Sequence, residues 1–207
     1  DINVEREVVV AEANAQPLPP PEGDQRLGQL ETGVVGVGPG VLVSCHALQA
    51  IRLRNHQHQT GSHGFDETQA AYRSRGIEAD VRPFIEDMAG AYGWADLAVC
   101  RSGALTVAEL AAAGVPAIMV PFPAAVDDHQ TRNAEYAVRA GAAKLLPEGD
   151  LTPISMAAVL RALLEAGRPL LLRMAVAART SAIVDADERL ADACVQAAVF
   201  FLMIRRP

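Results

Sequence analysis

The sequence has no excess of basic residues. Its 207 residues include 18 Lys and Arg against 25 Asp and Glu, which gives a formal net charge of −7 and an isoelectric point near 5.2. Nucleic-acid binders usually carry a basic face and a high isoelectric point. We therefore expect no general binding to nucleic acid, and any anionic ligand has to be held by local groups.

Cysteine is scarce. Cys45, Cys100 and Cys194 are an odd number at wide spacing, which favours reduced thiols in a cytosolic compartment over a disulfide framework or a zinc site. Two of the three lie in apolar runs, where we expect core positions. No Cys-His or Ser-His-Asp arrangement for covalent catalysis stands out either.

Long apolar runs are also lacking. No charged-then-apolar segment opens the printed sequence, and no run reaches the roughly 18 to 20 residues that a membrane-spanning helix needs. A peripheral contact with a membrane stays compatible with this pattern. Hydrophobic residues nevertheless make up 50% of the chain, which is enough for a globular domain with a full core.

The chain divides into three segments. Residues 1–30 read as a connector, with a short strand at Val8 to Val10 and a Pro-rich stretch at 17–21. Residues 31–198 form the expected domain. The tail 199–207 fits either an interfacial anchor or a translated sequencing adapter, and no function is assigned to it.

Short apolar strands alternate with longer helical patterns in the domain. Strands are expected at 34–35, 78–83, 95–100, 115–122 and 142–146, and helices at 66–75, 85–91, 103–114, 127–140 and 154–198. This alternation predicts an α/β domain with a doubly wound, Rossmann-like parallel sheet. Ligands bind beyond the carboxyl ends of such strands. The expected site is therefore at 101–106 and 121–130.

The stretch CRSGALTVAELAAAG, residues 100–114, predicts a helix that begins beside Gly103. Unpaired N–H groups at a helix start can hold a phosphate, and Gly103 and Ala104 allow a close approach. Glu109 lies about 4.5 Å beyond Thr106 along the same face and suits the paired hydroxyls of a ribose. The alternative is a simple Thr-x-x-Glu capping box. The direction of the Arg101 side chain stays open.

Two further polar groups need weighing. In VPFPAAVDDHQTRNA, Asp127 or Asp128 is expected to cap a helix, and Gln130 suits sugar hydroxyls. A metal site at Asp127, Asp128 and His129 is not expected, because three adjacent residues on a helix cannot converge on one ion. The second group is the histidines His56, His58 and His63, which alternate around HQTG in an expected strand and loop. They could bind a ligand together, but we expect surface or hydrogen-bonded structural positions for them.

The run FIEDMAGAYGWADLAVCRSGALTVAELAAAGVPAIMVPFPAAVDDHQTRNAEYAVRAGAAKLL, with HQTG and DETQAAYRSRGIEADV upstream, resembles the carboxyl-terminal domain of the MurG-type N-acetylglucosaminyltransferases. The resemblance implies the donor-binding half of a two-domain glycosyltransferase of the GT-B architecture. It departs from the family at GVGPGV, where Gly38 replaces a serine, and at Ala124, where a histidine is usual.

The resemblance also implies a function. UDP-N-acetylglucosamine is the donor, the membrane-bound muramoyl-pentapeptide lipid I is the acceptor, and the sugar is transferred with inversion in peptidoglycan synthesis. No metal and no cofactor are needed. The enzyme is expected to lie peripherally on the cytoplasmic side of the bacterial inner membrane.

Site residues follow by position in the family. No catalytic residue is expected in this chain, because the base belongs to the amino-terminal domain, and the chain alone is expected to be inactive in transfer. The substrate-binding residues implied are Ile85, Ala104, Leu105, Thr106, Val107, Ala108, Glu109 and Gln130.

Two other functions are open at this point. The chain could be the nucleotide-sugar domain of a related glycolipid glycosyltransferase. GVGPG also invites comparison with nicotinamide-binding oxidoreductases, but Pro39 lacks the N–H that such a turn needs.

Overall fold

The structure is a computed structural model, and it describes residues 8–10, 56–123 and 128–204. Predictions for the strand at 34–35, the Pro-rich stretch at 17–21, Gly38, Cys45 and Ala124 lie outside these residues.

One six-stranded sheet forms the centre of the molecule, in the order β3-β2-β1-β4-β5-β6. Its strands are β1 (Val8–Val10), β2 (Gln57–Gln59), β3 (Asp80–Arg82), β4 (Ala98–Cys100), β5 (Ala117–Met119) and β6 (Ala143–Leu145). The pairs β2–β3, β4–β5 and β5–β6 are parallel. The predicted α/β fold with strands and helices in alternation is confirmed.

The strand β1 differs from the expected all-parallel sheet. It runs antiparallel to both β2 and β4, and it lies inside the stretch that the sequence pattern assigned to a connector. Three consecutive valines indicate a strand because β-branched side chains fit a pleated surface, but they carry no information about its direction.

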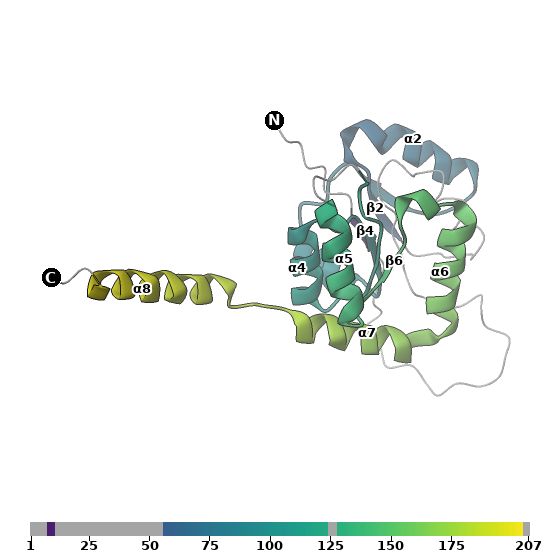
Figure 1. Cartoon of the computed structure of the whole chain (residues 1–207). Coiled ribbons are helices and arrows are strands. Elements are labelled where there is room, and N and C mark those ends of the chain that lie inside the picture. Colours follow the sequence, from purple (N-terminus) through teal and green to yellow (C-terminus); the bar gives the residue numbers. More distant parts are fainter. Residues whose placement is uncertain (1–7, 11–55, 124–127, 205–207) are drawn as a thin grey trace.

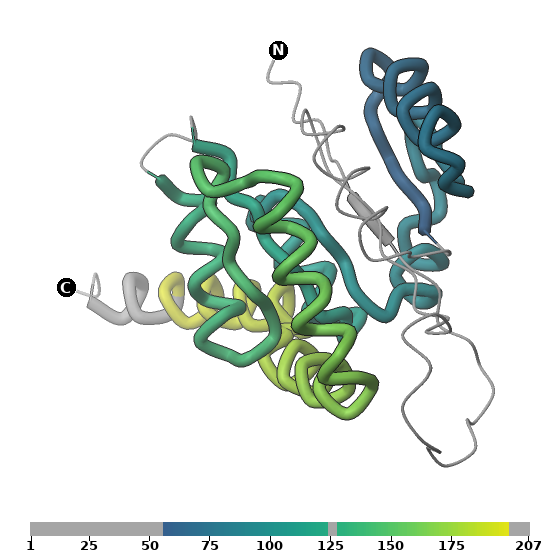
Figure 2. Tube along the Cα trace, turned by 90° about the vertical axis from the view of Figure 1, so that its right-hand side faces the viewer, coloured from purple at the N-terminus to yellow at the C-terminus, as the bar shows by residue number. Residues whose placement is uncertain are grey.

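Helices cover the sheet on two sides. They are α2 (Gly61–Ser74), α3 (Met88–Trp94), α4 (Ala104–Ala113), α5 (His129–Arg139), α6 (Pro153–Glu165), α7 (Gly167–Ser181) and α8 (Ala186–Ile204), with a 3-10 turn η3 at Glu148–Asp150. Figure 1 shows α4 and α5 on one side of the strands and α6 on the other, while α8 runs away from the body. Figure 2 shows the arrangement from the α6 side.

The core is built around the two strands that have helices on both sides. All three residues of β4 and of β5 are buried. Such strands are apolar at every position rather than at alternate ones, because neither face meets water. Each large side chain that is fully buried, such as Ile118, contributes about 1.5–3 kcal/mol.

Two predicted helix boundaries are wrong. The helix expected at 66–75 begins at Gly61, and the buried Thr68 hydroxyl supports this earlier start by donating a 2.6 Å hydrogen bond back to the Gly64 carbonyl. The helix expected at 85–91 is α3, which starts at Met88. The Asp87 carboxylate accepts a 2.8 Å hydrogen bond from the Gly90 N–H and so fixes the later start.

The helical region expected at 154–198 is confirmed as three separate helices. A capping box between Thr152 and Ser155 starts α6. Gly167, the first residue of α7, is left-handed with φ of 71° and so turns the chain away from the axis of α6. None of the helices in the described part is long and apolar enough to cross a membrane.

The cysteines behave differently from one another. Cys100 is fully buried, and burial raises the pKa of its thiol to about 12, so it remains protonated at neutral pH. Cys194 is exposed on α8 and does not belong to the core.

Candidate functional site

The carboxyl ends of five strands meet at one edge of the sheet. Because β1 is antiparallel to both β2 and β4, those two strands and their parallel partners all point the same way. The segments that follow β3, β4 and β5 contain Ile85, Gly103 and Gln130 respectively. The topology therefore brings the regions of the predicted site residues to a common edge.

The start of α4 has no side-chain cap. Gly103 is the N-cap residue, with φ of −59° and ψ of 145°, and the first helical bond joins the Val107 N–H to the Gly103 carbonyl at 3.0 Å. The N–H groups of the first turn have no partner within the helix. Thr106 lies inside this turn, so a capping box with Thr106 as its N-cap is excluded.

The Glu109 carboxylate lies on the next turn and is already oriented. The Tyr92 hydroxyl of α3 donates to Glu109 Oε2 at 3.1 Å. Thr106 and Glu109 are both half-buried, whereas Ala104, Leu105 and Ala108 are exposed. An acceptor thus lies one turn from an electropositive helix start, a combination that suits the hydroxyls and the diphosphate of a nucleotide.

The Arg101 guanidinium is directed toward the neighbouring loops. Its Nη1 makes a 2.5 Å ion pair with Glu148 and donates to the carbonyls of Val120 and Pro121, each at 3.2 Å. Its side chain is 15% exposed, and its Cζ atom lies 5.4 Å from the centre of the Phe122 ring. The direction of the Arg101 side chain, which the sequence left open, is toward these contacts, so Arg101 links the segments that follow β4, β5 and β6.

Hydrogen bonds attach the loop after β4 to α5. The Ser102 hydroxyl donates to the Gln130 carbonyl at 2.8 Å, and the Asn133 amide donates to the Ser102 carbonyl at 3.0 Å. The Phe122 N–H donates to Gln130 Oε1 at 3.0 Å. These contacts fix the start of α5 relative to the start of α4.

Asp128 is the N-cap residue of α5, as one of the two predicted alternatives had it. Its backbone has φ of 53° and ψ of 31°, the left-handed conformation that Asp tolerates better than most residues. Its side chain makes no capping bond within the described residues.

Two of the implied substrate-binding residues have buried side chains. Ile85 is 2% exposed and Val107 is 8% exposed. The Ile85 N–H donates to Gln59 Oε1 at 2.8 Å, and the Val107 N–H donates to the Gly103 carbonyl at 3.0 Å, so both backbone donors are already used within the protein. The sequence reasoning did not single out Phe84, which precedes Ile85, is 61% exposed and offers an aromatic face on which a base can stack. No periodicity marks it, because it lies in a loop.

The histidines occupy structural and surface positions, as predicted. His58 and His56 are buried and their rings pack against Tyr72, while the Tyr72 hydroxyl lies 3.1 Å from His58 Nδ1. Burial, and then the nearby His56, lower the pKa of His58 to about 3. His63 is exposed on α2.

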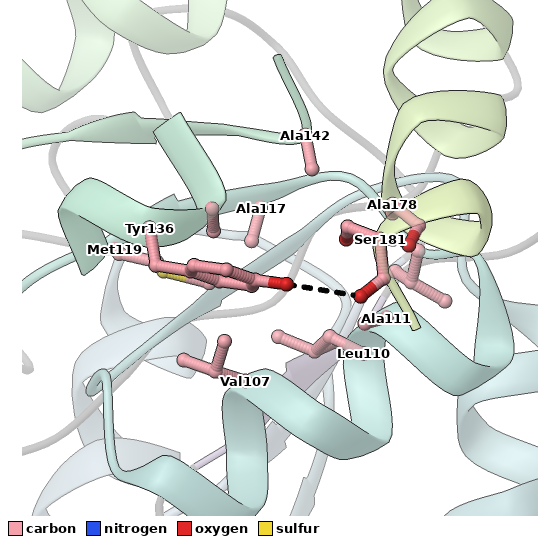
Figure 3. Close-up of a pocket in the computed structure, with 11 residues that line it drawn as sticks. Val107, Leu110, Ala111, Ala117, Met119, Tyr136, Ala142, Ala178 and Ser181 are labelled. Carbon is pink, nitrogen blue, oxygen red and sulfur yellow. Dashed lines mark hydrogen bonds between the residues drawn. The ribbon is translucent and has the colours of Figure 1, made fainter. Parts of the chain in front are cut away.

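A small apolar crevice lies between α4, α5 and α7 (Figure 3). It is lined by Val107, Leu110, Ala111, Val115, Ala117, Met119, Tyr136, Ala137, Ala142, Ala178 and Ser181. No charged side chain is among them, so the crevice does not suit a nucleotide. Within the described residues, no three His, Cys, Asp or Glu side chains gather as metal ligands.

Comparison with known proteins identifies the family. The model of the glycosyltransferase family 28 C-terminal domain matches residues 41–190. The chain belongs to this family. Among solved structures, the crystal structure of Acinetobacter baumannii MurG superposes with a TM-score of 0.68 at 42% identity, over 75% of this chain and 46% of that one.

Two curated relatives of this family 28 domain share the name UDP-N-acetylglucosamine–N-acetylmuramyl-(pentapeptide) pyrophosphoryl-undecaprenol N-acetylglucosamine transferase. The protein from Marinobacter nauticus is 50% identical over 188 residues, 86% of this chain and 52% of its own length. The protein from Methylococcus capsulatus is 56% identical over 142 residues, 69% and 40% respectively. The chain spans about half the length of such relatives or less.

Proposed function

We propose that the chain binds UDP-N-acetylglucosamine at the carboxyl edge of the sheet. The observation that carries the proposal is the uncapped start of α4 with the Glu109 carboxylate one turn further on. Backbone N–H groups at 104–106 would hold the diphosphate, and Glu109 would accept hydrogen bonds from the ribose hydroxyls.

The remaining contacts follow the strand order. Ile85 follows β3, and two strands, β2 and β1, lie between β3 and β4 in the sheet. The uracil would therefore extend toward β3, while the diphosphate stays at the start of α4. Gln130, at the start of α5, faces the sugar. Leu105 and Ala108 are exposed beside the helix start and complete the surface under the nucleotide.

We further infer the reaction in which this donor site takes part. The whole enzyme transfers N-acetylglucosamine, with inversion, to lipid I at the cytoplasmic face of the bacterial inner membrane. Helix N–H groups stabilise the departing diphosphate without a metal. The acceptor site and the base belong to the part of the relatives that this chain does not cover, so the chain alone binds donor and transfers nothing.

Calorimetric titration tests the donor assignment. UDP-N-acetylglucosamine should bind more tightly than UDP-galactose, and NADH should not compete. Tighter binding of UDP-galactose would point to a glycolipid transferase. Binding of NADH, with no binding of either UDP-sugar, would overturn the nucleotide-sugar assignment.

A variant tests the role of Glu109. Glu109→Ala should weaken UDP-N-acetylglucosamine by ~1–3 kcal/mol, the scale of a lost hydrogen bond to a charged group. Glu135→Ala is the matched control, because Glu135 is an exposed carboxylate on α5 that pairs only with its helix neighbour Arg139 among the contacts described. An unchanged affinity in Glu109→Ala would refute the ribose contact.

A further inference from the structure

We propose that Tyr92 is a positioning residue for donor binding, because its hydroxyl holds Glu109 in the orientation that receives the ribose. The inference rests on the proposed function and adds a residue from a different helix to the site. Tyr92 itself acts through Glu109 and does not touch the nucleotide.

The position of Tyr92 suits this role. It belongs to α3 and is 5% exposed, so its ring is fixed by packing. Its hydroxyl lies 3.1 Å from Glu109 Oε2. A buried ring with two rotatable bonds delivers that hydroxyl to one place, whereas an unrestrained glutamate side chain samples several rotamers.

The chemistry of the carboxylate leaves room for both partners. An ionised carboxylate has about four lone-pair positions and can accept several hydrogen bonds at once. The phenol occupies one of them at Oε2, and a carboxylate that holds such a contact can accept from vicinal hydroxyls at the same time. Tyr92 therefore reduces the entropy that Glu109 loses when the ligand arrives, which is preorganisation of the site.

A purely structural contact between α3 and α4 predicts a different outcome. In that case the loss of the hydroxyl would change the melting temperature, and any effect on binding would be the same for every uridine nucleotide. If the hydroxyl acts through Glu109, the effect requires a ligand that has ribose hydroxyls.

The test compares two probes on the full 207-residue chain, UDP and 2′,3′-dideoxyuridine diphosphate. Tyr92→Phe should weaken UDP by about three- to tenfold, which corresponds to one hydrogen bond, and should leave the dideoxy probe within about twofold of wild type. Tyr92→Met, which fills irregular apolar space, replaces it in the same assay if Tyr92→Phe proves to be unfolded.

Tyr136→Phe is the control. It removes the same hydroxyl from a hydrogen bond of the same length, 3.1 Å to the Ser181 carbonyl (Figure 3), away from the carboxyl edge. Both probes should bind this variant as they bind wild type.

The outcomes separate the two proposals. Equal losses for both probes in Tyr92→Phe, or no loss for UDP, overturn the positioning role and leave the donor assignment standing. A wild-type chain that does not distinguish UDP from the dideoxy probe overturns the ribose contact of Glu109, and the positioning role with it.

Discussion

At the scale of single residues, Gln130 shows how one contact sets the direction of a side chain. A backbone N–H can only donate, so the hydrogen bond from Phe122 identifies the amide atom 3.0 Å away as Oε1. The Nε2 group must then point the other way, and no described residue accepts a hydrogen bond from it. A donor is thus available at the start of α5.

This orientation predicts a selective loss. Gln130→Ala should weaken UDP-N-acetylglucosamine by about 0.5–1.5 kcal/mol, because one hydrogen bond to the sugar disappears, and should weaken UDP much less. Titration with both ligands measures the difference, and Gln69→Ala on α2 serves as the control. Equal losses for the two ligands would exclude a contact to the sugar.

Single-residue roles could be predicted only where local spacing determines them. Glu109 is three residues beyond Thr106 in any helix, so the sequence places the two on one face. The Tyr92–Glu109 and Arg101–Glu148 contacts join residues 17 and 47 positions apart. Such pairs depend on how helices and loops pack, which no local pattern contains.

At the scale of one element, glycines mark both ends of α4. Gly103 caps its start, and Gly114 follows its last turn in the left-handed conformation, with φ of 72°. A Cβ at Gly114 would lie 3.5 Å from the Ala175 carbonyl of α7. The sequence predicted both ends correctly, because Gly is the residue most often found just past a helix.

Gly103 offers a test of the helix start that should leave the fold intact. Its φ of −59° is accessible to alanine, and among the described residues a Cβ there would meet only the Thr106 hydroxyl, at an ordinary 3.8 Å. Gly103→Ala should change the free energy of unfolding by less than ~1 kcal/mol. It should weaken UDP by about tenfold or more, because a methyl group occupies the space that the diphosphate needs.

Thermal melting and titration of the same sample separate these two effects. Gly149→Ala is the control, because no atom of the described part of the chain lies within 4 Å of a Cβ at Gly149. Retained affinity in Gly103→Ala would mean that no ligand atom approaches Gly103 closely.

Helix starts without a glycine signal were harder to predict. The sequence pattern began the helix before β4 at Ile85 because apolar spacing continues there, whereas the Asp87 cap delays it to Met88. For α2 the difference has the opposite sign, because the helix begins at Gly61 and not at residue 66. In both cases a tertiary contact or a cap outweighed the propensity of the terminal residues.

At the scale of the whole molecule, the buried His58 makes the free energy of unfolding depend on pH. The pKa of His58 is about 3 in the folded chain, against an ordinary value of 6.5. Between these values the unfolded chain binds a proton at this position and the folded chain does not. Stability therefore falls as the pH is lowered through this window, by up to about 1.4 kcal/mol per pH unit for this one group.

Urea unfolding at a series of pH values from neutral to acidic measures this slope. His58→Gln should make this slope shallower, because unfolding of the variant takes up about one proton fewer in this pH range. His63→Gln, at an exposed position on α2, should leave the slope unchanged. A slope that is the same in His58→Gln and wild type would contradict the assignment.

The overall architecture could be predicted from the sequence, except for the direction of one strand. Strand and helix periods alternate regularly from residue 56 onward, and the family resemblance covers the same region. The direction of β1 is set by which neighbours it pairs with across the sheet, and that is a property of the assembled chain rather than of three valines.

The cluster around Arg101 has a mechanical consequence for the edge where the nucleotide is proposed to lie. One guanidinium connects the segment leaving β4, two carbonyls of the segment leaving β5, and Glu148 of the turn that follows β6. A displacement of any one of these segments pulls on the other two. We therefore expect the three segments that follow β4, β5 and β6 to move together rather than as independent loops.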